Sequence, residues 1–493
     1  MRTALILLFL LALAAIPGSV VPQSAQSAMK VSDFAANHPT LDRICRPLGM
    51  YHVYTSVWFS AIYLLLLISL IGCIVPRIVS HAKALRRQPP RVPARLDRLA
   101  AHASMITSAS AAEVSQRAQQ WLTSHRYRFV VDDDGSLRAE AGRHRETGNL
   151  VFHIFLVFVL VGVGWNTLWG FKGTSVVVEG QGFSNSITQY DEFKAGAMVD
   201  TDNLTPFSMK LRKFVVSFET GTVQRGAARS FDATVDLTMG GKTQTRDLQV
   251  NHPLRIGSTK VHLLGHGYAA DVVVRDGDGK VAYSGPVVFL PQDANFKSVG
   301  VIKVPDARPD RLAFQGFFLP TGAITAGGPT SLFPDALNPQ LYLTAWYGKP
   351  TVETGVPSNI YTLDTTGLTQ VTNGKDKARF VLSPGQRYKL PDGKGSIQFN
   401  GWQRWAKIQV SQNPGLPLTF LSVVLSVAGL CVSLFSRSRR VWVRTIPGDD
   451  GLRVEIGGLD RSDSRSGAVD DVNSLLAALH GDSMSGDVGE EHS

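Results

Sequence analysis

A single histidine inside an apolar stretch is the residue of this sequence best suited to chemistry. His153 lies near the start of the uncharged run 150–171. An ionisable side chain at that depth in hydrocarbon is costly, so by default it marks a functional site. One helical imidazole supplies one axial position to a haem iron, one step of a proton relay, or one hydrogen bond to a neighbouring helix. The residue alone leaves these interpretations open, together with a packing role.

Basic residues come directly before this run. Arg143, His144 and Arg145 could pair with the carboxylates of a porphyrin, or could simply anchor the helix at a membrane surface. His144 is nine residues from His153, about half a turn out of phase on a continuous helix. We therefore do not expect these two histidines to ligate one iron together.

Three further histidines, His252, His262 and His266, lie close together in the second half of the chain. The spacing from His262 to His266 would suit a metal on a helix, but the surrounding sequence predicts strand and Gly-rich turn. No cysteine or acidic residue completes a zinc pattern there. A haem or metal role for these histidines is the minor alternative.

The three cysteines are Cys45, Cys73 and Cys431, and no CxxC motif is present. The chain is therefore not a dithiol oxidoreductase on its own. Of the three, Cys45 alone falls outside the apolar runs, where it is either an incidental thiol or a participant in thiol exchange. The sequence also lacks GxSxG, HExxH and phosphate-binding glycine motifs, so no nucleophile is nominated.

Four apolar runs must position these residues. They cover 4–21, 57–75, 150–171 and 416–435, and the last three contain no Asp, Glu, Lys or Arg. At about 1.5 Å per residue, such lengths cross a hydrocarbon core of about 30 Å. The sequence predicts a membrane protein with four transmembrane helices.

The location of the positive charge predicts the orientation of these helices. The net charge is +10, and basic residues cluster after the second and fourth runs. Those two flanks are therefore expected on the cytoplasmic side. The clusters adjoin membrane runs and lack interleaved aromatic residues, so a nucleic-acid partner is not expected. The basic residues in question are Arg77, Lys83, Arg86, Arg87, Arg91, Arg95 and Arg98, and then Arg437, Arg439, Arg440 and Arg444.

The first run has two interpretations. The start of the chain resembles a cleavable signal peptide, with Arg2, the apolar run and the small residues Ala12 and Ala14. A retained helix fits as well, because the apolar run continues past Pro17 and Gly18. We expect retention, which places both termini on the cytoplasmic side of the plasma membrane.

The segments between the runs predict a large and a small folded part. The long segment reads as short alternating strands with Gly-rich turns, typical of a mostly-β, sandwich-like extracytoplasmic domain. The strands are expected at 175–179, 209–218, 231–239, 260–264, 271–275, 299–304, 341–346 and 396–399. Trp402, Arg404, Trp405 and Lys407 are expected to form an interfacial belt before the last helix.

The cytoplasmic loop predicts a small α+β unit, with a capped helix at 110–124 and a hairpin around 132–135. The tail is expected to be partly disordered apart from a short helix near 472–480. The predicted boundaries are 1–21 helix 1, 22–56 outer loop, 57–75 helix 2, 76–148 cytoplasmic loop, 149–171 helix 3, 172–414 extracytoplasmic domain, 415–435 helix 4 and 436–493 cytoplasmic tail.

Short motifs on this four-helix plan carry a family resemblance. They are Ile16-Pro17-Gly18-Ser19, Ser56-Val57-Trp58-Phe59-Ser60, Gly72-Cys73-Ile74-Val75-Pro76-Arg77, Arg145-Glu146-Thr147-Gly148-Asn149-Leu150-Val151-Phe152-His153, Val250-Asn251-His252-Pro253-Leu254 and Ser411-Gln412-Asn413-Pro414-Gly415. Their order and placement resemble the ResB family of system II cytochrome c biogenesis over almost the whole chain.

The resemblance implies a function. ResB-type proteins work with a CcsA-type membrane partner to move haem across the membrane, keep it reduced and present it for attachment to the CxxCH motif of apocytochrome c. In that family a histidine at the start of the third helix is a haem axial ligand, and His153 occupies that position here. The tryptophan-rich haem-handling motif belongs to the partner, and Trp165 and Trp169 do not reproduce it.

The resemblance therefore implies haem b as the transported or transiently bound cofactor. It also implies a chain that is non-catalytic alone, as one subunit of a cytochrome c synthetase, with a thioredoxin-like thiol reductant as a further candidate partner. The alternative is a membrane-tethered extracytoplasmic binding or sensor protein without a haem role. In that case His153 is a packing residue and the β domain is the functional module.

Overall fold

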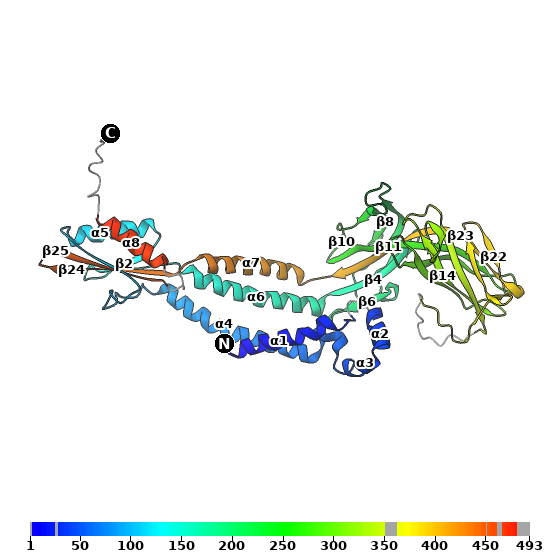
Figure 1. The fold of residues 1–493 in the computed structure, drawn as a ribbon, viewed down its shortest axis with the longest axis horizontal. Helices are drawn as coiled ribbons and strands as arrows, with labels where there is room; N and C mark the ends of the chain where they lie inside the picture. Colours follow the sequence, from blue (N-terminus) through cyan, green and yellow to red (C-terminus); the bar gives the residue numbers. More distant parts are fainter. Residues whose placement is uncertain (1, 25–27, 351–361, 450, 461–465, 481–493) are drawn as a thin grey trace, which may run out of the picture. The chain divides into compact units, whose positions relative to one another are not determined.

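The computed structural model describes residues 2–24, 28–350, 362–449, 451–460 and 466–480. The chain divides into two compact units. The first combines Met1–Gly164 with Gly415–Ser493, and the second is Trp165–Pro414. Each is described by itself below, and Figure 1 shows their helices and strands.

Long apolar helices make up much of the first unit. The helices are α1 (Arg2–Val20), α4 (Val57–Arg86), α6 (His144–Trp169) and α7 (Leu416–Phe435). Within the described residues, three segments are long and apolar enough to cross a membrane, namely Pro39–Arg86, His144–Trp169 and Leu416–Phe435. The apolar part of α1, Leu5–Val20, is shorter. The chain therefore has the helices of a membrane protein.

The second of these helices is longer than the sequence predicts. We expected it to end near residue 75, before Pro76 and Arg77, whereas α4 continues through Pro76 to Arg86. A proline removes one backbone donor and usually kinks or ends a helix. Here residues 76–86, which we expected in the following loop, continue the helix. His81 is one of them.

The segment between α1 and α4 ties α1 to the rest of the unit. It forms α2 (Ala28–Asn37), α3 (Pro39–Cys45) and the 3-10 helix η1 (Met50–Thr55). The Gln23 side-chain amide donates to the carbonyl O of Met50 at 2.9 Å, and its oxygen accepts from the backbone N of Val53 at 3.1 Å. A Cβ on Gly18 would lie 2.8 Å from the Tyr54 ring, so α1 packs closely there.

The first unit also contains a five-stranded antiparallel sheet. Its order is β1-β25-β24-β3-β2. The strands are β1 (Ala101–Thr107), β2 (Arg128–Val131), β3 (Leu137–Ala141), β24 (Arg439–Gly448) and β25 (Gly451–Asp460). The predicted helix and hairpin are present as α5 (Ala111–Ser124) and β2–β3. Two of the three inner strands, β24 and β25, come from the tail.

The tail therefore differs from our expectation of a partly disordered segment with one short helix. It supplies β24, β25 and the longer helix α8 (Ser466–His480), while 481–493 lie outside the described residues. Helices α5 and α8 lie side by side on the sheet (Figure 1). Their buried side chains share one core with the strands, including Trp121, Leu122, Val443, Ile456 and Leu475.

The Pro-rich segment after α4 is bound to the same sheet by side-chain donors. The Arg138 guanidinium donates to the carbonyl O of Pro89 at 3.1 Å, and the indole N–H of Trp442 donates to that of Pro90 at 3.0 Å. Prolines lack an N–H but keep a carbonyl acceptor. The segment therefore lies along β3 and β24 as a strap held through its carbonyl groups.

The second unit is mostly β, as the alternating pattern predicted. A large sheet has the path β18-β17-β14-β13-β12-β11-β23-β4-β6, and a four-stranded sheet has the order β5-β7-β8-β9. The large sheet consists of β4 (Phe171–Val178), β6 (Glu192–Ala195), β11 (Thr259–Arg275), β12 (Val281–Pro291), β13 (Ser298–Val304), β14 (Arg311–Leu319), β17 (Gln340–Gly348), β18 (Thr369–Gln370) and β23 (Ser396–Gln412), with β10 (Leu254–Ile256), β21 (Arg379–Leu382) and β22 (Arg387–Lys389) beside this path. The smaller sheet consists of β5 (Gly182–Ser184), β7 (Ser208–Phe218), β8 (Ala228–Met239) and β9 (Lys242–Gln249).

Short elements complete the described part of this unit. The two-stranded ribbons are β15 (Gly322–Thr325) with β16 (Gly328–Ser331), and β19 (Thr372–Asn373) with β20 (Asp376–Lys377). The 3-10 turns are η2 (Ile187–Gln189) and η3 (Pro391–Gly393).

Two long strands connect two hydrophobic cores in this unit. β11 and β23 pair from Thr259↔Gln412 to Arg275↔Ser396, with two irregularities in register. At one end Val261 and Ile408 belong to a core closed by the four-stranded sheet. At the other, Val272 and Phe399 belong to a second core. The two predicted strands 260–264 and 271–275 are thus one strand.

The expected interfacial belt is wrong, because those residues lie within β23. Trp405 is only 4% exposed, and its indole N–H donates to the carbonyl O atoms of Tyr268 at 3.0 Å and Phe289 at 3.2 Å. Arg404 is 6% exposed, and its guanidinium lies 2.7 Å from the Asp335 carboxylate. These side chains stabilise the β domain.

Candidate functional site

The histidine singled out by the sequence lies on α6 and is half-buried. Its Nδ1 is 2.7 Å from the carbonyl O of Asn149, one turn earlier in the same helix. A carbonyl oxygen only accepts, so this contact assigns the proton of the neutral ring to Nδ1. The Nε2 lone pair of His153 is then available to a ligand. Metal-binding histidines are commonly held in this way.

Small residues fix how α6 meets α7. A Cβ on Gly148 would lie 2.6 Å from the carbonyl O of Gly429, and one on Gly162 would lie 2.4 Å from the Oγ1 of Thr419. Such close approach is typical of helix pairs in membranes. His153 is five residues beyond Gly148, about 140° further around the helix at 100° per residue. Its side chain therefore points away from α7.

A second histidine joins α4 to α6 and was missed by the sequence analysis. His81 Nε2 lies 2.9 Å from the Thr147 hydroxyl. No pattern in the sequence indicated this pair, because we expected α4 to end before residue 81. The phenol of Tyr63 also donates to the carbonyl O of Leu160 at 3.2 Å. These contacts hold α4 against the helix that carries His153.

The basic residues before α6 are placed differently from one another. The side chain of Arg143 already has partners within the fold. Its guanidinium lies 3.3 Å from the Glu140 carboxylate and donates to the carbonyl O of Ala84 at 2.7 Å. His144 and Arg145 are exposed in the first turn of α6. Of the three, the latter two therefore have side chains free to meet an anionic group.

The histidines of the second unit do not converge on a metal. His252 is exposed, and His262 lies on β11 opposite Gln409. His266 stacks on Phe296 with ring centroids 4.6 Å apart. Burial, with a smaller contribution from Arg404, lowers the pKa of His266 to about 4. Among the described residues, no group of three His, Cys, Asp or Glu could hold a metal ion.

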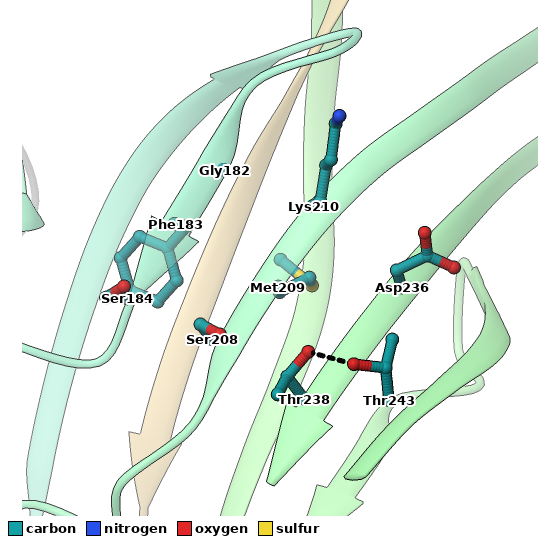
Figure 2. A pocket seen from close by; sticks show the side chains of 9 residues that line it. All are labelled: Gly182, Phe183, Ser184, Ser208, Met209, Lys210, Asp236, Thr238 and Thr243. Carbon is teal, nitrogen blue, oxygen red and sulfur yellow. Dashed lines mark hydrogen bonds between the residues drawn. The ribbon is translucent and has the colours of Figure 1, made fainter. Parts of the chain in front are cut away.

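An open cavity of about 470 Å³ lies on the four-stranded sheet of the second unit. Figure 2 shows Lys210 and Asp236 in its lining, with a dashed line between the hydroxyls of Thr238 and Thr243, which are 2.8 Å apart. Ser184 and Ser208 add further hydroxyl groups. None of the histidines predicted from the sequence lines this cavity.

Known proteins show the same sequence pattern over nearly the whole chain. The model of the ResB-like family matches residues 1–469. The chain belongs to the ResB-like family. Among its relatives, the cytochrome c biogenesis protein CcsB of Synechococcus sp. (strain JA-3-3Ab) is 24% identical over 90% of this chain and 82% of its own length.

Two more relatives carry that name. CcsB of Microcystis aeruginosa is 22% identical over 93% of this chain and 89% of its own length. CcsB of Nostoc sp. (strain PCC 7120 / SAG 25.82 / UTEX 2576) is 24% identical over 93% and 86%. As a member of the ResB-like family, the chain therefore aligns with most of the length of these CcsB proteins.

Proposed function

We propose that this ResB-like protein acts in cytochrome c biogenesis as a haem-handling subunit. Together with a CcsA-type membrane partner, it moves haem across the plasma membrane and presents it, reduced, for attachment to apocytochrome c. The observation that carries the proposal is the contact of His153 Nδ1 with the carbonyl O of Asn149 at 2.7 Å. It leaves Nε2 of an intramembrane imidazole ready to bind iron.

The membrane arrangement that goes with this function has four spans. α1 serves as the first, supported by the contacts of Gly18 with Tyr54 and of Gln23 with Met50 and Val53. Such contacts favour a retained helix over a cleaved one. Basic residues after α4 and α7 favour a cytoplasmic location for the five-stranded sheet. His153 then lies about 14 Å along α6 from its first residue, at about 1.5 Å per residue, in the inner leaflet.

The residues of this chain bind and orient the cargo. When bound, haem supplies an iron with two axial positions and a porphyrin whose carboxylates seek cations. His153 Nε2 takes one axial position, and the Asn149 carbonyl fixes the ring. The exposed His144 and Arg145 meet the carboxylates at the cytoplasmic end of α6. One histidine fills one position, so the partner provides the second.

The β-rich unit supports the partner and receives apocytochrome c on the outer side. A thioredoxin-like reductant that keeps the two cysteines of the CxxCH motif reduced is a further candidate partner. No CxxC is present in this chain to do that work.

The test is the haem content of the protein purified with its partner. We expect a b-type spectrum from the wild type, loss of that spectrum in His153→Gly, and partial recovery when imidazole is added. His102→Gly is the control, because it removes an exposed histidine on β1 to which the proposal gives no part in binding haem. An unchanged haem content in His153→Gly would contradict the assignment of His153 as a haem ligand.

Deletion of the gene separates this function from the sensor alternative. A haem-handling subunit is required for every c-type cytochrome of the cell, so all of them are expected to disappear. Retention of normal c-type cytochromes in the deletion strain would contradict the proposed function, whatever the purified protein binds.

A further inference from the structure

The last strand of the four-stranded sheet has one regular side without a strand partner. β9 (Lys242–Gln249) pairs with β8 in unbroken register from Met239↔Lys242 to Asp232↔Gln249. In the described part of the chain, no other strand pairs with its second side, which has an isolated bridge to His252 at its last residue, Gln249. Residues 242–247 are all exposed. A long, regular edge of this kind can accept another strand.

The turn before β9 determines which backbone groups point outward. Gly240 and Gly241 have φ of 52° and 76°, as in a two-residue type I′ hairpin. The residues that flank such a turn, Met239 and Lys242, exchange backbone hydrogen bonds. Because the pattern alternates, Thr243 and Thr245 direct their N–H and C=O groups away from β8.

The side chains of β9 differ between its two faces. On one face the polar groups are satisfied by β8, since Thr245 donates to Asp236 at 2.8 Å and Asp247 accepts from Thr234 at 3.2 Å. The other face carries Lys242 and Arg246. Arg246 donates to the side chain of Gln244 at 2.8 Å and makes no ion pair within the described residues.

No acidic side chain in the described strands β7 to β9 forms an ion pair with Lys242 or Arg246. Asp236 pairs with Arg212. Asp232 accepts from Gln249 at 2.6 Å. Lys242 and Arg246 are four residues apart on one face, about 13 Å along a strand that rises about 3.3 Å per residue. The open edge is therefore positively charged along one face at a fixed spacing.

We propose that the outer edge of β9 binds an extended segment of a partner polypeptide as an added strand. The segment carries two acidic side chains four residues apart, facing Lys242 and Arg246. The backbone groups of Thr243 and Thr245 provide the pairing, and the two cations select the charge. This inference goes beyond haem handling and needs no haem ligand.

The structural alternative is that Lys242 and Arg246 only protect the edge from aggregation, as charges on edge strands often do. The two explanations make different predictions. Protective charges repel strands without regard to register, whereas a docking edge binds one charge pattern in preference to its reverse.

The test uses the full-length protein and capped, fluorescent Thr/Val peptides of the 8-residue length of β9. One peptide has two Glu residues four positions apart, a second has Lys at those positions, and a third has the two Glu residues adjacent, on opposite faces. We expect the first to bind at least about tenfold more tightly than the others. Equal binding of all three, or no binding of the first at about 1 mM, would overturn the proposal.

Backbone pairing is tested at Thr245. Thr245→Pro removes an outward N–H while leaving the backbone hydrogen bonds to β8 in place, because proline is tolerated on the free side of an edge strand. Thr245→Val loses the same hydroxyl and keeps the N–H. We expect the proline variant to weaken binding about tenfold and the valine variant to change it less than about twofold. Equal effects of the two variants would contradict strand addition.

Charge selection is tested by the double variant Lys242→Glu/Arg246→Glu. It is expected to reverse the preference, so that the Lys peptide binds more tightly than the Glu peptide. An unchanged preference would leave edge protection as the role of these residues and overturn the proposal.

Discussion

Gly148 and Gly429 meet where α6 and α7 pack. A Cβ on Gly148 would lie 2.6 Å from the carbonyl O of Gly429, and one on Gly429 would lie 2.8 Å from the backbone N of Phe152. The two backbones therefore touch without side chains between them. This contact fixes the rotation of α6 and so the direction in which His153 points.

Gly429→Val is expected to separate the two helices and destabilise the protein, because the added methyl groups meet backbone atoms that cannot move aside. Overpacking of this kind costs about 1–3 kcal/mol. Gly164→Ala in α6 is the control, since its Cβ would have no described atom within 4 Å. Thermal unfolding in detergent measures both, and equal midpoints would contradict the packing described here.

Arg404→Ala is expected to destabilise the β domain by about 2 kcal/mol. The change removes the contact with Asp335 at 2.7 Å and the cation–π contacts with Tyr268 and Trp402, at 4.9 and 5.6 Å from the ring centroids. The comparison is Arg229→Ala, whose side chain is 49% exposed where it pairs with Glu219 at 2.9 Å, against 8% for Arg404. That pair is worth less than about 1 kcal/mol. Urea unfolding distinguishes the two costs.

His266 is expected to make the β domain sensitive to acid. Burial holds its folded-state pKa at about 4, below the ordinary value of 6.5. Between these values the unfolded chain binds more protons than the folded one, so stability is lost as pH falls from about 6.5 to about 4. The full loss is about 3 kcal/mol at 1.36 kcal/mol per pKa unit.

The measurement is urea unfolding of the wild type and His266→Phe at several pH values in this window. The phenylalanine keeps an aromatic ring beside Phe296 and cannot titrate, so its stability is expected to fall less with acid. His252→Gln, at an exposed position, is expected to follow the wild type. A wild-type slope in His266→Phe would show that another group is responsible.

Truncation after Ser438 is expected to unfold the five-stranded domain. It removes β24 and β25, leaving β1 without its partner and the β2–β3 hairpin on its own. An isolated hairpin is marginal in water. A chain ended after His480 keeps all described strands and helices and serves as the control. Limited proteolysis of residues 101–141 reports the outcome, and equal resistance would contradict this pairing.

Local patterns predicted much of the β domain, but strand lengths depended on distant contacts. Gly267 lies between the two strands predicted at 260–264 and 271–275. In the structure, its missing side chain leaves room for Trp405, because a Cβ there would lie 2.4 Å from the indole ring. The residues that we expected to form an interfacial belt belong to β23, the strand that pairs with β11. Cross-strand packing of this kind has no signature within either segment.

The candidate site was located by sequence, but its geometry was not. The position of His153 in an apolar run could be read directly. The Nδ1 contact with Asn149 depends on a rotamer, and the packing of α6 on α7 depends on glycines in two distant segments. His81 was missed because a proline inside a long helix resembles a helix end.

The five-stranded sheet imposes an order on biosynthesis. Its strand β3 ends at Ala141, and β24, which pairs with it, begins at Arg439. At about 5–20 residues per second, a ribosome needs roughly 15–60 s to make the intervening chain. During that time β1, β2, β3 and α5 have left the ribosome without the strands that complete their sheet. Chaperones that act during translation therefore meet this segment as an unfinished domain, and assembly of the sheet must follow the synthesis of β24 and β25.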